Sequence, residues 1–187
     1  EIFKNYENGQ LKEKRNYKEG KDDGLYEVYY ENGQLKYKGN YKGLDQYGKK
    51  KKVGLYEEYY ENGQLEEKLN YEESEDEDVS RIHGLYESYY ENGQLEFKKN
   101  VKDGGEHGVH ESYYENGQLE EKKNYDDDLP INTDPFSNEK GNIVGLFERY
   151  YENGQLREKR NYNKDGKKDG LCEVYYENGQ LREKMKL

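Results

Sequence analysis

Residues 24–35 read GLYEVYYENGQL, and the second half of this stretch recurs along the chain. The string ENGQL begins at seven positions: Glu7, Glu31, Glu61, Glu91, Glu115, Glu152 and Glu177. Successive copies lie 24, 30, 30, 24, 37 and 25 residues apart, so the unit is about 24 residues and the longer intervals contain insertions. A period of this kind predicts a repeat protein, in which each unit packs on its neighbours.

The Asn32-Gly33 pair predicts the turn of a β-hairpin in each repeat. Asn and Gly best tolerate the positive φ angles that a type I′ turn requires at both central residues. A four-residue loop over Glu31 to Gln34 predicts the same register. In that register Tyr30 faces Leu35, Val28 faces Tyr37, Glu27 faces Lys38 and Tyr26 faces Gly39.

The predicted register places a glutamate opposite a lysine in six repeats. The pairs are Glu27 and Lys38, Glu57 and Lys68, Glu87 and Lys98, Glu111 and Lys122, Glu148 and Lys159, and Glu173 and Lys184. Opposed charges across a strand pair contribute roughly 0.2–1 kcal/mol each. Because the pair recurs six times, we interpret it as a structural ladder and not as a catalytic pair.

Side chains alternate between the two faces of a strand, so the register also predicts the faces. One face carries Tyr26, Tyr30, Leu35 and Tyr41, and we expect it to be the packed one. The other carries Leu25 and Tyr29 beside the Glu-Lys pair, with Gln34, Lys36 and Asn40. Variable residues between fixed tyrosines are typical of a binding groove, and equally of a solvated strand centre. The candidate partner-binding face comprises nine tyrosines: Tyr26, Tyr30, Tyr56, Tyr60, Tyr86, Tyr90, Tyr114, Tyr151 and Tyr176.

Short links rich in turn residues join the hairpins, as in Lys18–Gly24 and Asn163–Gly170. They permit each hairpin to pair with the next, and no segment shows a 3.6-residue apolar period. We therefore expect an all-β fold, an elongated single-layer antiparallel meander of tandem β-hairpin repeats with little or no helix. The predicted hairpins cover 1–23, 24–53, 54–83, 84–107, 108–144, 145–169 and 170–187, with longer links at 42–53, 72–83 and 126–144.

Composition limits the function classes. The net charge of −11 disfavours binding to nucleic acid and to anionic lipid, whereas it fits solubility or a basic partner. No stretch approaches 18 apolar residues, so no membrane insertion is expected. The chain begins at Glu1 and ends at Leu187 inside repeats. We interpret it as a fragment or a processed form, so the localisation stays open between cytoplasmic and secreted or surface-exposed.

No catalytic, cofactor-binding or metal-binding site is predicted. The chain contains no Gly-rich phosphate loop, no Cys/His metal spacing and no nucleophile elbow. His83 and His107 fall in predicted links, and His110 and Cys172 replace the tyrosine of other repeats. Cys172 is therefore interpreted as a half-buried structural thiol. The acidic run at 72–78 lacks the glycine and the spacing of a calcium loop and reads as a solvated charge run.

The pattern GLYExYYENGQL with a following Tyr-Lys-x-Gly resembles the MORN repeat family. It is most similar to the shorter bacterial variant described as YwqK-like antitoxins. The resemblance covers nearly the whole chain and implies an extended β-sheet that serves as a scaffold or binding surface, with no catalytic residues. Three functions follow as hypotheses: a protein-binding or scaffolding module, an antitoxin or immunity protein that neutralises a protein toxin, and a secreted or surface adhesin-like protein that binds glycans. The open strands at the two ends of the sheet also favour end-to-end self-association.

Overall fold

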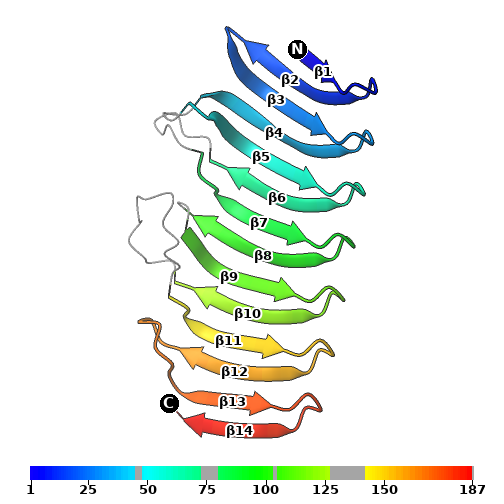
Figure 1. The fold of residues 1–187 in the computed structure, drawn as a ribbon. Helices are drawn as coiled ribbons and strands as arrows, with labels where there is room; N and C mark the ends of the chain where they lie inside the picture. The colour runs from blue at the N-terminus through cyan, green and yellow to red at the C-terminus, as the bar shows by residue number, and fades with distance from the viewer. Residues whose placement is uncertain (45–47, 73–79, 103–104, 127–141, 187) are drawn as a thin grey trace. The chain divides into compact units, whose positions relative to one another are not determined.

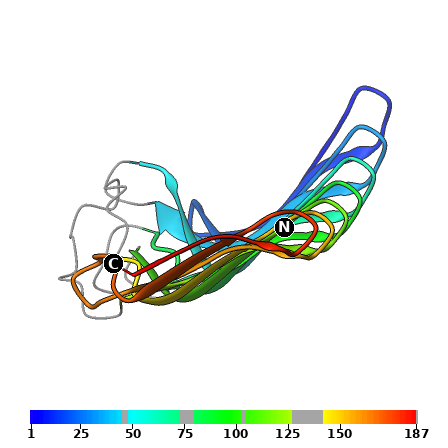
Figure 2. The same ribbon diagram turned by 90° about the horizontal axis from the view of Figure 1, so that it is seen from below.

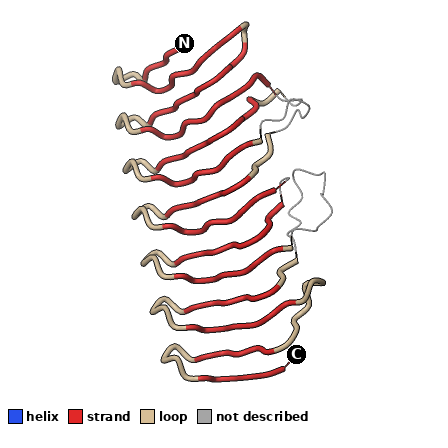
Figure 3. The backbone as a smooth tube through the Cα atoms, turned by 180° about the vertical axis from the view of Figure 1, so that it is seen from behind, coloured by secondary structure: helices blue, strands red, loops and turns tan. Residues whose placement is uncertain are grey.

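The computed structural model describes residues 1–44, 48–72, 80–102, 105–126 and 142–186. These residues form fourteen β-strands joined by loops and turns, without a helix (Figure 3). The chain divides into two compact units, Glu1–Gly93 and Gln94–Leu187. The unit boundary falls in the tip of the fourth hairpin.

In both units the strands run antiparallel and follow one another in sequence order (Figure 1). The first unit contains β1 (Ile2–Asn5), β2 (Leu11–Lys18), β3 (Lys21–Tyr29), β4 (Leu35–Leu44), β5 (Lys50–Tyr59), β6 (Leu65–Tyr71) and β7 (Gly84–Tyr89). The second contains β8 (Leu95–Lys102), β9 (Gly105–Tyr113), β10 (Leu119–Tyr125), β11 (Gly145–Tyr150), β12 (Leu156–Tyr162), β13 (Leu171–Tyr175) and β14 (Leu181–Lys186). The predicted all-β meander of consecutive hairpins is confirmed. Strand β5 already begins inside the predicted link 42–53, and most of the 126–144 link lies outside the described residues.

The hairpin tip differs from the predicted type I′ turn. The Gly33 amide donates to the Tyr30 carbonyl at 3.0 Å, and the Tyr30 amide donates to the Gln34 carbonyl at 2.8 Å. These two bonds enclose a three-residue loop, Glu31 to Gly33, in which only Gly33 has a positive φ, of 87°. Such a loop is a type I turn followed by a glycine in the left-handed region. The Asn32 side chain stays inside the loop and accepts a hydrogen bond from the Gln34 amide at 2.8 Å.

The three-residue loop shifts the register by one residue, and a β-bulge restores it. Leu35 pairs with Tyr29, whereas Val28 pairs with Tyr37, Glu27 with Lys38 and Tyr26 with Gly39. The prediction that Leu35 faces Tyr30 was therefore wrong, and the other three pairings are confirmed. The extra residue in the bulge is Lys36, which compensates for the odd number of residues in the loop. A two-residue turn with positive φ at both positions does occur, but in the link at Glu19-Gly20.

Neighbouring hairpins are joined by backbone ladders and by side chains at the tips. The ladder is long where the link is a tight turn or is itself part of the strands, as between β2 and β3, β4 and β5, and β8 and β9, and it is short near mid-strand elsewhere. Between β10 and β11, for example, the ladder contains only Glu121 with Arg149 and Lys122 with Glu148. At the tips, the Tyr30 hydroxyl donates to the Tyr59 carbonyl at 2.8 Å, and the Asn32 amide donates to the Glu61 carbonyl at 2.9 Å. The same tyrosine bond recurs from Tyr6, Tyr60, Tyr114 and Tyr151. Within each unit the tip loops are stacked one behind another (Figure 2).

The two faces of each sheet differ in burial. We call the face that carries Tyr26, Tyr37, Tyr41 and Tyr56 and their equivalents the tyrosine face, and the face that carries Leu25, Glu27 and Lys38 and their equivalents the lysine face. The buried apolar residues of both units are Tyr26, Tyr41, Tyr56, Leu69, Val101, Tyr125, Phe147 and Cys172. They occupy the tyrosine face, as predicted for the packed side, and the leucines of the Leu25 position are exposed.

Candidate functional site

The tyrosine face of the first unit is filled by an aromatic cluster. Tyr26 makes edge-to-face contacts with Tyr37 and Tyr41, at centroid distances of 5.8 and 5.4 Å. Tyr56 continues the cluster with contacts to Tyr37 and Tyr71. Gly39 permits this packing, because a Cβ atom there would lie 2.8 Å from the Tyr56 ring. The cluster is therefore a small core in which tyrosine rings on one face of a single sheet pack against one another.

The start of strand β5 closes this core with ammonium groups. Lys50 Nζ lies 3.9 Å from the centroid of the Tyr26 ring, and Lys52 Nζ lies 3.8 Å from that of Tyr56. Burial lowers the pKa of Lys52 and raises the pKa of Tyr71 to about 12. The buried tyrosines therefore stay protonated at neutral pH, where they pack and donate hydrogen bonds and do not act as bases.

In the second unit, charged groups occupy the equivalent positions of the tyrosine face. Lys99 and Lys123 both pair with His110, which stands at the position of Tyr56. The Lys99 ammonium donates to Glu106 at 2.7 Å, and His110 Nδ1 lies 3.8 Å from the same carboxylate. His110 and Lys99 together hold the pKa of Glu106 well below its usual range, against the effect of burial. Every charge of this group has an opposite charge beside it, which is typical of a structural network.

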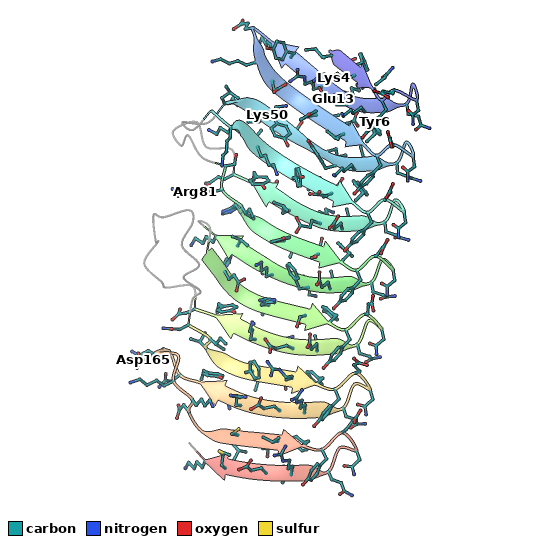
Figure 4. All side chains as sticks on the ribbon, in the orientation of Figure 1. Lys4, Tyr6, Glu13, Lys50, Arg81 and Asp165 are labelled. Atoms are coloured by element: carbon teal, nitrogen blue, oxygen red, sulfur yellow. The ribbon has the colours of Figure 1, made fainter. Side chains whose placement is uncertain are left out.

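A second carboxylate extends the network toward the strand centre. Glu121 accepts hydrogen bonds from Lys123 at 2.8 Å and from Arg149. Burial alone would raise the pKa of Glu121, but these two cations lower it. The first unit also has a charged network near its N-terminal end. Lys4 Nζ lies 2.8 Å from Glu13 (Figure 4), and the buried Asp22 lies 2.9 Å from Arg15 and 3.1 Å from Lys50.

The nine tyrosines of the predicted partner-binding face have different surroundings. Tyr26 and Tyr56 are buried, and Tyr86 donates its hydroxyl to Glu67 at 2.6 Å. Tyr30, Tyr60, Tyr114 and Tyr151 are half-buried and donate to the carbonyl of the next hairpin. Tyr90 is half-buried, and Tyr176 is exposed. Most of these tyrosines thus hold the repeats together, and a partner-binding role for them stays a prediction.

The lysine face carries a row in which glutamates and lysines alternate from strand to strand. The pairing expected within hairpins is confirmed for Glu27, Glu57, Glu111, Glu148 and Glu173. It extends between hairpins, because Lys38 also pairs with Glu57 and Lys68 with Glu87. In the second unit the row runs through Lys98, Glu111, Lys122, Glu148, Lys159, Glu173 and Lys184. Within the second unit, Glu111, Glu148 and Glu173 therefore each lie between two lysines, which the sequence pattern of single hairpins did not reveal.

The ammonium groups of this row lie outside the carboxylates. Glu111 lies 2.7 Å from Lys98 Nζ and 2.8 Å from Lys122 Nζ, and it also accepts the Tyr113 hydroxyl. Burial raises the pKa of Glu111, but these three donors outweigh burial and lower it to about 2. In the ion pairs of the row, the lysine side chains are 38–51% exposed and the glutamates only 12–18%. The outer layer of the row is therefore cationic.

A row of exposed apolar residues runs beside the charged row. It comprises Leu25, Leu55 and Leu85 in the first unit, and Val109, Leu146 and Leu171 in the second. These side chains remain 37–47% exposed. Leu25, Leu55, Val109 and Leu146 lie opposite asparagines across the hairpin, such as Asn40 opposite Leu25, whereas Leu171 lies opposite Lys186. Exposed apolar surface can mark an interaction site when it is contiguous, so the in-register repetition makes this row a candidate interaction surface. The repeated Leu of the GLYE motif was the sequence signal for this row.

The histidines and the cysteine do not form a site in the described part of the chain. His107 lies within β9 and not in a link, and no group of three or more His, Cys, Asp or Glu residues there could hold a metal ion. Cys172 is buried opposite Met185, in the packing position predicted for it. Across the described ranges, none of the segments is a helix long and apolar enough to span a membrane.

Comparison with known families agrees with this architecture. A model described as a MORN repeat variant matches seven segments: 1–19, 22–42, 52–73, 82–103, 106–127, 143–164 and 168–186. The chain belongs to the MORN repeat variant family. Each match spans the two strands of one hairpin, so one MORN repeat corresponds to one hairpin with its tip. No curated protein matches the chain.

Proposed function

We propose that this MORN repeat protein is a non-catalytic module that binds another protein through its lysine face. Repeats of this family are generally regarded as protein-binding or membrane-binding modules. The exposed Leu and Val row beside the Glu-Lys row carries the proposal. An antitoxin would be one form of this function, with a toxin as the bound protein.

Three observations support the lysine face over the tyrosine face. The tyrosine face already buries its aromatic groups against one another, and in the second unit Lys99 is paired with Glu106 and Lys123 with Glu121. On the lysine face, the apolar side chains of the row from Leu25 to Leu171 remain exposed. Its charged row is rigidly held, because each ion pair is fixed by the register of two strands. A rigid surface with repeated apolar contacts is well suited to protein binding, since little ordering entropy is lost.

A capture experiment with matched variants tests the proposal. The variant Leu55→Ser, Leu85→Ser, Leu146→Ser, Leu171→Ser removes four exposed side chains of the row, and Leu44→Ser removes a leucine outside the row that is still more exposed, at the link end of β4. Proteins captured from a lysate of the source cell should be retained by the Leu44→Ser variant and lost from the row variant, while circular dichroism shows both folded. Equal capture by the row variant would contradict binding through this face.

A further inference from the structure

The lysine face of the second unit carries two parallel rows with a regular spacing. The apolar row contains Val109, Leu146 and Leu171, and the charged row lies two residues further along each strand. Two residues along a strand correspond to about 6.7 Å, so a single elongated partner reaches both rows. The lysines stand on every second strand, which places them about 9.6 Å apart.

The charges of the row select the kind of partner. It contains four lysines and three glutamates, and the glutamates are the recessed groups. An ammonium group has three donors, so each lysine retains donors for a carboxylate that arrives from outside. A second copy of this face would offer these lysines only glutamates that are recessed and already paired. Carboxylates next to apolar side chains are therefore the complementary surface, even though the chain as a whole has a net charge of −11.

We propose that this face binds an acidic amphipathic helix that lies across the strands. This inference rests on the proposed protein-binding function. The apolar stripe of the helix covers Val109, Leu146 and Leu171, and glutamates beside the stripe meet Lys98, Lys122 and Lys159. Seven residues of an α-helix rise about 10.5 Å, close to the lysine spacing of about 9.6 Å. Glutamates that repeat every seven residues thus face successive lysines.

Two designed peptides test the charge requirement on the full chain. One is a helix of about three heptads with leucines on one stripe and glutamates beside it, and the other has lysines in place of those glutamates. Isothermal titration calorimetry at low salt should show binding of the glutamate peptide and at least about tenfold weaker binding of the lysine peptide. The affinity should also fall with added salt, because the charged contacts are exposed.

Matched variants then locate the contact. Lys122→Gln with Lys159→Gln should lower the affinity for the glutamate peptide by about tenfold. Arg157 and Arg182 are exposed arginines outside both rows, so Arg157→Gln with Arg182→Gln should change this affinity by less than about twofold. Leu146→Ser with Leu171→Ser leaves the ion pairs intact and should also weaken binding by about tenfold. This second variant keeps the test valid where loss of the lysines alters the fold.

Several outcomes would overturn the inference. Tighter binding of the lysine peptide would assign the face to a basic partner. Lysine-dependent binding to phosphatidylserine vesicles, with no binding of either peptide, would assign it to a membrane surface. A dimer in light scattering that the lysine variant abolishes would assign it to a second copy. Lysate capture that needs the leucine row, without binding of the glutamate peptide, would refute the helix and leave the protein-binding function standing.

Discussion

The two units fill equivalent rows of the tyrosine face in different ways. In the first unit, Tyr56 packs over Gly39 within a cluster of tyrosines. In the second, His110 takes the place of Tyr56 and lies between Lys99 and Lys123. The backbone register is the same in both, since the tips and the Glu-Lys row are unchanged. The hairpin tips and the Glu-Lys row, which fix the register, are therefore separate from the residues that fill the packed tyrosine face.

Removal of the aromatic ring should have the largest effect. Tyr56→Ala deletes a buried ring with two aromatic neighbours and a lysine above it, and should lower the free energy of unfolding by about 3–4 kcal/mol. The matched change His110→Ala deletes a smaller, less buried ring and should cost about 1–2 kcal/mol. Urea unfolding followed by circular dichroism gives both values. Equal losses would mean that the two fillings contribute alike.

The charged network should make the second unit sensitive to acid. The pKa of Glu106 is lowered in the folded state, so its stabilisation is complete above the unfolded pKa near 4.5 and disappears as the pH falls below it. Glu106→Gln should therefore cost about 1–2 kcal/mol at pH 7, after allowance for solvent screening, and progressively less as the pH falls from 4.5 through the lowered folded-state pKa. Urea unfolding at several pH values measures this difference.

Glu66 in the first unit is the control, because its pKa is shifted in the direction opposite to that of Glu106. Burial raises its pKa, and the carboxylates of Glu58 and Glu67 add to the effect. Its ionised form is therefore disfavoured in the folded state, and Glu66→Gln should leave the stability at pH 7 unchanged or slightly higher. A loss comparable to that of Glu106→Gln would show that removal of a carboxylate charge is harmful at both positions, regardless of the surrounding charges.

The contacts between hairpin tips should be sensitive to the loss of single tyrosine hydroxyl groups. Tyr30→Phe removes the bond to the Tyr59 carbonyl and should cost about 1 kcal/mol. Tyr176→Phe alters a tyrosine that is 52% exposed, so its effect should be close to zero. Thermal unfolding of the two variants provides the comparison. If both behave like the parent chain, the tip tyrosines do not hold the hairpins together.

Most of the backbone architecture could be predicted because it is encoded within each repeat. The ENGQL spacing gave the hairpins, and three of the four residue pairs in the predicted register are present. The tip was wrong because the Asn-Gly rule considers one hairpin alone. Asn32 also bonds to the Glu61 carbonyl of the next hairpin, and this contact suits a three-residue loop in which Asn32 keeps a negative φ.

The candidate surface was less predictable, because it depends on exposure in three dimensions. Leu25 and Tyr26 are adjacent apolar residues, and nothing in their chemistry says which is covered. The structure shows Tyr26 contacted by Tyr37 and Tyr41 of β4 and by Lys50 of β5, all three of which come from other strands. The continuity of the charged row was likewise hidden, since the pairing of Lys38 with Glu57 crosses a link of variable length.

The ties at the hairpin tips have a consequence for how such a chain can lengthen. Each donor is a side chain, from Tyr30 or Asn32, but each acceptor is a backbone carbonyl, of Tyr59 or Glu61. A backbone carbonyl is present whatever residue occupies that position, so a duplicated hairpin finds its docking points on any successor. Gene duplication can therefore add whole hairpins, and deletion can remove them, without compensating changes elsewhere. Inserted residues accumulate in the links between hairpins and not at the tips.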